Sequence, residues 1–174
     1  MVRILMILVP DEPLTLETDS ILRLERFVGP FYTLRDTGAE IVLTSPEGGF
    51  PWMGLARDDQ ADSELIRRFK SDRAAREELM DTLRLEQTYA EDFDAAFCIG
   101  YPGTIWRDPP VAGALIAALL KSGKPVAVIP SNLDLSPLGV GDGLLIMGDR
   151  AVTPVLAAQA LLGALEDTST HKGN

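Results

Sequence analysis

Five short apolar segments alternate along this chain with stretches of helical periodicity, and this alternation limits the fold more than any other feature. The segments are rich in β-branched residues, which is typical of strands buried on both faces of a sheet. Strands separated by helices favour a parallel sheet. The sequence therefore predicts an α/β fold, a doubly wound, mostly parallel sheet flanked by helices and flavodoxin-like in outline. The expected strands are residues 2–9, 40–44, 92–99, 126–129 and 144–147.

The helices are expected between these strands, and the whole is expected to form one domain. Proline at position 30 cannot donate to a helix, which predicts a kink or a second helix beginning at Pro30. Residues 1–166 are expected to form a single domain, because 174 residues suit one core, and residues 167–174 a frayed polar tail. The expected helices are residues 16–35, 62–70, 72–85, 109–122 and 151–166.

The composition disfavours several classes of partner. The formal net charge of −10 argues against binding to nucleic acid or to an anionic membrane surface. No apolar run reaches the length of a membrane span, and Met1–Pro10 is interpreted as a strand and not as a signal peptide. A single cysteine, Cys98, excludes an internal disulfide framework and fits a reducing cytoplasm, where the protein is expected.

The turn after the fourth expected strand is where a ligand site is predicted. Val126–Ile129 is a short apolar run, after which the chain turns sharply at Pro130, Ser131 and Asn132. In open α/β sheets, ligands bind in the crevice outside the carboxyl ends of the strands. Any chemistry of this protein should therefore involve this turn and its neighbours.

Five stretches of the chain match, in the same order, the motifs of a known family. The longest is Asp36–Gly49, which leads through a predicted strand into a Gly-Gly turn. The others are Leu83–Leu85 with Glu91–Ala95, then Gly100–Trp106, Gly123–Ala127 and Leu144–Asp149. Together these stretches resemble the ThiJ/PfpI superfamily, also called the DJ-one or class I glutamine amidotransferase-like superfamily. The resemblance covers most of the chain and implies a flavodoxin-like sheet and a homodimer.

The residues that carry the family's chemistry are replaced here. The resemblance places the family's nucleophilic cysteine and the histidine after it at Pro130 and Ser131. It places the acidic partner at Arg26, with Glu25 one step away, and the second glycine of the oxyanion turn at Tyr101. Proline fixes φ near about −65° and cannot adopt the strained conformation of a nucleophile turn. The resemblance therefore implies a divergent member that lacks the nucleophilic cysteine.

Other residues offer weak alternatives for catalysis, so enzymatic activity is not expected. Cys98 lies inside an expected strand, where a buried thiol behaves as an inert apolar group. Ser131 needs a base, but the one histidine is His171 in the tail, and Glu25 as an ordinary carboxylate is a poor base for serine. Ser131 is interpreted as the cap of a helical turn. Neither a metal centre nor a cofactor is predicted, because the sequence has no paired histidines.

Three functions stay open on the sequence. The favoured one is a non-catalytic domain that binds a small ligand or a protein partner. The second is a lyase or hydrolase for small carbonyl compounds or amides, glyoxalase- or amidotransferase-like, with Ser131 or Glu25 recruited. The third is a chaperone-like or structural subunit. A homodimer is expected because the helical stretches 111–120 and 152–165 carry more apolar surface than one buried face needs.

A small, shallow anion site is expected at the carboxyl edge of the sheet. The backbone N–H groups of Ser131 and Asn132 begin a helical turn, where partial positive charge favours anions. Arg26 adds a guanidinium able to hold a carboxylate through two hydrogen bonds, and Tyr101 either frames the site or fills it. The candidate ligand-binding residues are Glu25, Arg26, Gly100, Tyr101, Pro130, Ser131 and Asn132.

Overall fold

The computed structural model describes residues 1–9, 22–50, 53–54, 63–100, 111–130, 145–147 and 154–171. The strands in these ranges are β1 (Arg3–Leu8), β2 (Leu22–Arg23), β3 (Glu40–Ser45), β4 (Met53–Gly54), β5 (Leu83–Arg84), β6 (Ala95–Gly100), β7 (Val126–Pro130) and β8 (Leu145–Met147). Six of them form one sheet in the order β5-β3-β1-β6-β7-β8, with every neighbouring pair parallel. The α/β doubly wound fold predicted from the sequence is confirmed.

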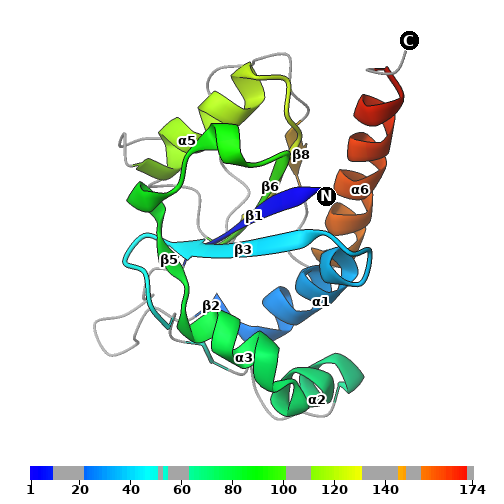
Figure 1. Cartoon of the computed structure of the whole chain (residues 1–174). Coiled ribbons are helices and arrows are strands. Elements are labelled where there is room, and N and C mark those ends of the chain that lie inside the picture. The colour runs from blue at the N-terminus through cyan, green and yellow to red at the C-terminus, as the bar shows by residue number, and fades with distance from the viewer. Residues whose placement is uncertain are drawn as a thin grey trace.

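Helices cover both faces of this sheet (Figure 1). They are α1 (Leu24–Arg35), α2 (Glu64–Ser71), α3 (Arg73–Met80), α5 (Val111–Lys121) and α6 (Pro154–His171), with 3-10 turns η1 (Leu85–Gln87) and η2 (Ala90–Asp92). One face carries α1 and α6, and α2 packs on α1. The other face carries α5 together with the two 3-10 turns. The pair β2–β4 forms a separate two-stranded sheet.

The central strand β1 shows why both faces are closed. Its residues are apolar without interruption from Ile4 to Leu8, and all of them are fully buried. Because side chains alternate across a strand, Ile4, Met6 and Leu8 join the core under α1, α2, α3 and α6. Leu5 and Ile7 join the core under α5.

The α1 face is filled by aromatic rings. Phe27 stacks on Phe31 with 4.9 Å between ring centroids, and Phe69 of α2 meets Phe27 edge-on at 5.8 Å. Tyr32 meets Phe31 edge-on at 5.1 Å. Offset and edge-to-face arrangements suit the ring quadrupoles, so this cluster fixes α2 against α1.

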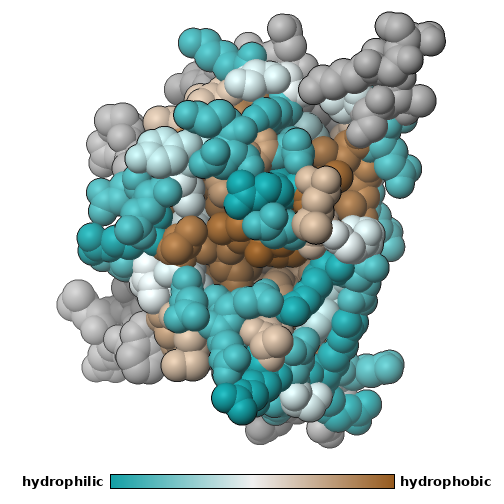
Figure 2. All heavy atoms as spheres, in the orientation of Figure 1, coloured by the Kyte–Doolittle hydropathy of each residue, from teal (hydrophilic) through white to brown (hydrophobic). Residues whose placement is uncertain are grey.

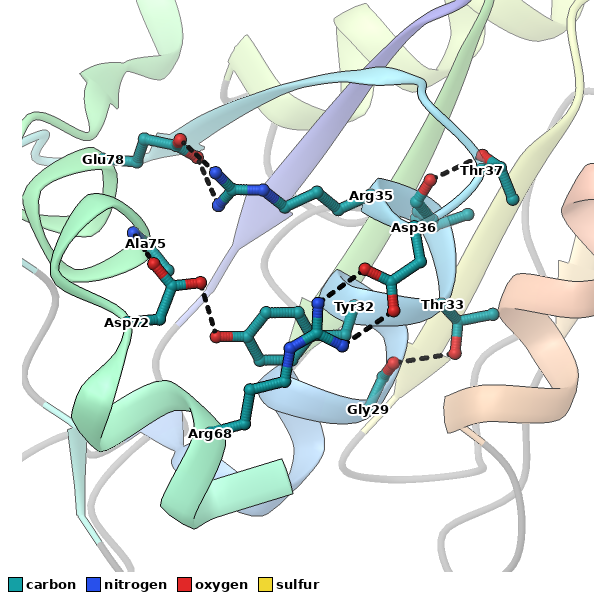
Figure 3. A network of polar contacts seen from close by, with 11 residues as sticks. Gly29, Tyr32, Thr33, Arg35, Asp36, Thr37, Arg68, Asp72, Ala75 and Glu78 are labelled. Carbon is teal, nitrogen blue, oxygen red and sulfur yellow. Dashed lines mark hydrogen bonds and ion pairs between the residues drawn. The ribbon is translucent and has the colours of Figure 1, made fainter. Parts of the chain in front are cut away.

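A polar network ties α2 and α3 to the outside of α1 (Figure 3). Arg68 holds the Asp36 carboxylate through two hydrogen bonds of 2.6 and 2.7 Å, and its guanidinium lies 3.8 Å from the Tyr32 ring centroid. The Tyr32 hydroxyl donates to Asp72 Oδ2 at 3.0 Å, while Asp72 Oδ1 accepts from Ala75 N and so caps α3. Arg35 pairs with Glu78 at 3.1 Å.

Helix α1 differs from its sequence-based prediction at its start and at Pro30. It begins at Leu24, because Leu22–Arg23 pairs with Met53–Gly54 as a strand, and residues 16–21 lie outside the described ranges. Of the two expected outcomes at Pro30, the second helix is wrong, since one helix runs to Arg35 with Pro30 inside it. Thr33 Oγ1 donates to the Gly29 carbonyl at 2.8 Å. Gly29 also lets α6 approach, because a Cβ there would lie 2.8 Å from Val155 Cγ2.

Three further boundaries differ from the predictions. The helix expected to reach residue 85 ends at Met80, because Leu83–Arg84 pairs with Thr44 and Ser45 of β3. The third expected strand begins at Ala95, after η2. The last helix continues to His171, although a frayed tail was expected from residue 167. There the Thr168 hydroxyl donates to the Ala164 carbonyl at 2.7 Å.

Candidate functional site

The carboxyl ends of the parallel strands meet at one edge of the sheet, where the site was predicted. The last residues of β6 and β7, Gly100 and Pro130, are direct register partners. Val9, which follows β1, donates its backbone N–H to Ile99 O at 2.8 Å. Three chain segments far apart in the sequence therefore come together at this edge.

The backbone itself requires a glycine at position 100. Its φ is +122°, a conformation that residues with a Cβ rarely adopt. A Cβ on Gly100 would lie 1.7 Å from the Val9 carbonyl oxygen, which is too close for any side chain. The glycine thus permits the close approach of β1 and β6 at the edge where the site is expected.

Arg26 reaches the same edge from the first turn of α1. Its Nη2 donates to the Ile129 carbonyl oxygen at 3.4 Å, across 103 residues of sequence. The side chain is half-buried, and its Nε is shielded from solvent. The expected closeness of Arg26 to the end of β7 is confirmed. This places a guanidinium, which has five N–H donors, beside the strand that ends in Pro130.

The structure describes the other predicted site residues only in part. Glu25 belongs to α1 and Pro130 ends β7, but their side chains are outside the described part of the structure. Tyr101, Ser131 and Asn132 lie outside the described residues altogether. The geometry of the site therefore stands on Arg26, Gly100 and the backbone of β7.

Cys98 lies inside the sheet, two residues before the end of β6, and has no exposure to solvent. It lies inside β6 opposite Val128, and its side chain is fully buried in the core under α5. Burial raises the pKa of the Cys98 thiol to about 12, because the thiolate would lose its hydration. Since the thiolate is the nucleophilic form, the expected inertness of this cysteine has a direct physical cause.

The side chain of Arg84 in β5 lies against the turn after β3, a contact that the sequence analysis did not predict. Arg84 Nε donates to the Glu47 carbonyl at 3.1 Å, and a Cβ on Gly48 would lie 2.6 Å from Arg84 Cγ. The backbone N–H groups of Gly48 and Gly49 donate to Ser45 and to the Thr82 carbonyl. Because the N–H groups of Gly48 and Gly49 are already bonded within the protein, they do not form an anion cradle. The long-range pairing of β5 with β3 brings Arg84 here, which no local pattern signals.

The described ranges contain neither a candidate metal cluster nor a helix suited to a membrane span. In that part of the chain, no group of three or more His, Cys, Asp or Glu side chains is placed to hold a metal ion. None of the described helices is long and apolar enough to cross a membrane.

Solved structures share this fold at low sequence identity. No protein-family model and no curated protein sequence matches the chain. The Rapid Encystment Protein of 24 kDa (REP24) from Francisella tularensis superposes with a TM-score of 0.70 at 13% identity, over 95% of this chain and 99% of that one. Glyoxalase III from Candida albicans superposes with a TM-score of 0.63 at 15% identity, over 94% of this chain and 97% of that one. At these identities the likeness concerns the fold.

Proposed function

We propose that this protein is a ThiJ/PfpI-like domain that has lost cysteine-dependent catalysis and binds a small carboxylate or similar anion at the carboxyl edge of its sheet. The motifs from Asp36 to Asp149 resemble that superfamily, and the fold likeness to REP24 and glyoxalase III supports it. The observation that carries the binding proposal is the position of Arg26 beside the end of β7.

Two observations support the loss of catalysis: proline stands at the nucleophile position, and the remaining cysteine is buried. The residue that ends β7 is Pro130, where the resemblance places the nucleophile. The one cysteine of the sequence, Cys98, is fully buried with its pKa raised to about 12 by burial. A thiol of that pKa carries almost no thiolate at neutral pH. Glyoxalase-type chemistry through a cysteine is therefore not part of this proposal.

The binding of an anion rests on how Arg26 is held. The Ile129 carbonyl accepts a hydrogen bond from Nη2, which orients the guanidinium across the end of β7. Arg26 lies in the first turn of α1, where backbone N–H groups and the helix dipole add positive potential. A half-buried guanidinium can hold a planar carboxylate through two parallel hydrogen bonds, which a lysine ammonium cannot do.

Titration with acetate, lactate and phosphate, followed by ¹⁵N–¹H NMR, tests this binding. Arg26→Ala should weaken carboxylate binding by roughly 1.5–3 kcal/mol, the range for a hydrogen bond to a charged group. Arg76→Ala is the matched control, because Arg76 is an exposed arginine of α3. Helix α3 lies beside β3, which two strands separate from β7 in the sheet. Equal effects of the two variants, or no shifts near Ile129, would contradict the proposal.

Methylglyoxal consumption tests the absence of catalysis. Wild type, Cys98→Ala and Ser131→Ala should all show the rate of buffer alone. Iodoacetamide should label Cys98 in the native protein only as fast as the protein opens, because the thiol is fully buried. Turnover that Ser131→Ala or Glu25→Gln abolishes would favour the lyase or hydrolase alternative.

A further inference from the structure

Within the part of the chain that the structure describes, one edge of the sheet is paired over only part of its length. The outermost strand β5 pairs only with Thr44 and Ser45, the last two residues of β3. Within the described residues, no strand pairs with the outer side of β3 from Glu40 to Leu43. Unpaired strand edges are templates for the addition of another strand.

The backbone groups on this edge belong to Ile41 and Leu43. Glu40 N donates to the Val2 carbonyl at 2.9 Å, so the backbone of Glu40 is directed toward β1. Alternate residues of a strand direct their N–H and C=O groups to opposite sides, so those of Ile41 and Leu43 are directed outward. Because the groups of Thr44 face β1, its parallel pairing with Leu83 uses the Leu43 carbonyl, which leaves both groups of Ile41 and the N–H of Leu43 for an added strand. A strand added here would find donors and acceptors at alternate positions.

A groove of about 410 Å³ runs along this edge between β3 and α3. Ile41, Val42, Leu43 and Leu83 give it an apolar floor, and Figure 2 shows this apolar surface over β3, surrounded by hydrophilic residues. Ile41 and Val42 are only partly buried by their own chain. The groove is therefore suited to the side chains of an extended segment as well as to its backbone.

The groove carries acidic side chains, and that of Asp81 has no basic partner within the described ranges. Glu77, Glu78 and Asp81 of the α3 region line it, and no basic side chain does so among the described residues. Glu77 pairs with Arg73 and Glu78 with Arg35, whereas Asp81 has no ion pair within the described ranges. A second copy of this chain would bring the same carboxylates and a formal charge of −10, so like charges would oppose it.

We propose that the edge of β3 is a docking site for an extended, basic segment of another protein. The segment adds to β3 as a strand, with its backbone bonded to Ile41 and Leu43. Because side chains alternate along a strand, every second residue would face α3, and lysine or arginine there would meet Glu77 and Asp81. This surface is separate from the anion site at Arg26 and does not depend on it.

A labelled octapeptide of alternating lysine and valine is the probe. It should bind and slow hydrogen exchange at the Ile41 and Leu43 amides of the wild-type protein. A lysine–proline peptide of equal charge should not bind measurably, because proline lacks the N–H groups of a strand. The double variant Glu77→Gln/Asp81→Asn should bind the first peptide about two- to fivefold more weakly per exposed pair lost. The variant Glu64→Gln/Glu91→Gln, which has the same net charge, should bind it as wild type does.

Each other outcome overturns the proposal. Absence of binding does so, as does equal binding of the lysine–proline peptide or equal weakening by both double variants, since these would indicate charge attraction alone. Protection of the Ile41 and Leu43 amides that rises with protein concentration without peptide would assign the edge to a second copy. The peptide controls use the unaltered protein, so the result does not depend on the folding of a variant.

Discussion

The two faces of the sheet are both closed by helices, but they differ in what holds the helices in place. Under α1 the core is built from large rings, and outside it the ion pairs of Arg35 and Arg68 tie on α2 and α3. Under α5 the sheet presents aliphatic and small residues without rings, among them Leu5, Ile7, Ala96, Cys98 and Val128, which face four buried leucine and isoleucine side chains of the helix. One described polar tie crosses there, from Lys124 Nζ to the Ala90 carbonyl at 2.8 Å.

This difference shows how one sheet can carry two kinds of layer. Aliphatic and small side chains on the α5 face let a single helix pack closely, mainly by apolar contact. The α1 face carries a second layer, since α2 packs on α1 and α3 packs on α2, and polar contacts to α1 specify its position. Stability should therefore respond to ring size and to pH on the α1 face, and mainly to packing on the α5 face.

Gly100→Ala should have the largest effect and should disrupt both faces together. The added Cβ would lie 1.7 Å from the Val9 carbonyl oxygen, so β1 and β6 must separate. We expect a loss above about 4 kcal/mol or failure to fold, measured by circular dichroism during thermal unfolding. Gly163→Ala is the control, because nothing lies within 4 Å of its added Cβ in α6, and it should stabilise by about 0.5–1 kcal/mol.

Truncation of one core side chain on each face measures the contrast directly. Phe31→Ala should cost about 3–5 kcal/mol of unfolding free energy, since Phe31 is fully buried and contacts two other rings. Cys98→Ala on the α5 face should cost about 1 kcal/mol, because it removes one small buried atom. Denaturant unfolding with equal losses for the two variants would contradict the difference between the faces.

Tyr32→Phe isolates the polar part of the α1 face. It keeps the ring under Arg68 but removes the hydroxyl that donates to Asp72, which should cost about 1.5 kcal/mol of unfolding free energy. Tyr89→Phe is the matched control, because Tyr89 is exposed and should stay within about 0.5 kcal/mol of wild type. A similar loss in both variants would mean that the hydroxyl of Tyr32 does not hold α3.

Acid should loosen the α1 face selectively. The hydrogen bonds from Arg68 lower the pKa of Asp36, and those from Ala75 N and Tyr32 lower the pKa of Asp72. Carboxyls with lowered pKa stabilise the fold above their ordinary value of 3.8, and this contribution is lost as pH falls through the folded-state pKa. Hydrogen exchange should therefore speed up in α2 and α3 below about pH 4 before it does in α5. Asp36→Asn should reduce this acid dependence.

Alkaline pH should act on both faces instead. Burial and the bond to Asp72 raise the pKa of Tyr32 to about 12, and burial alone raises that of Cys98 to about 12. A raised pKa contributes stability below the ordinary value, which is lost as pH rises through the folded-state pKa. Unfolding free energy should accordingly fall above about pH 10 in wild type, and less steeply in Tyr32→Phe.

The outer surfaces of the two layers differ in one smaller respect. Leu156 of α6 is 54% exposed, whereas the outward positions of α5 carry the alanines Ala114 and Ala117. If the expected homodimer uses one of these helices, α6 offers the larger apolar side chain. Light scattering at tens of micromolar should give a dimer for wild type and Ala117→Asp, and a monomer for Leu156→Asp. A wild-type monomer would contradict the expected homodimer.

The sequence by itself determined the order and type of the main elements. The apolar runs that became β1, β3, β6, β7 and β8 are local patterns, and so is the Asp72 cap of α3. Local periodicity and capping act within a few residues, which is why they can be recognised without a structure. The burial of Cys98 followed in the same way, because it lies in the middle of an apolar run that reads as a buried strand.

Only the tertiary structure decided the features that join distant residues. Leu83 and Arg84 became a strand through Thr44 and Ser45, although local spacing favoured a continued helix. The need for glycine at position 100 comes from Val9, and the acidic groove exists because α3 lies beside the free edge of β3. Arg26 reached Ile129 across the fold, where only the family resemblance had pointed. Such contacts depend on the packing of the whole chain, so tertiary interactions override local propensity at these positions.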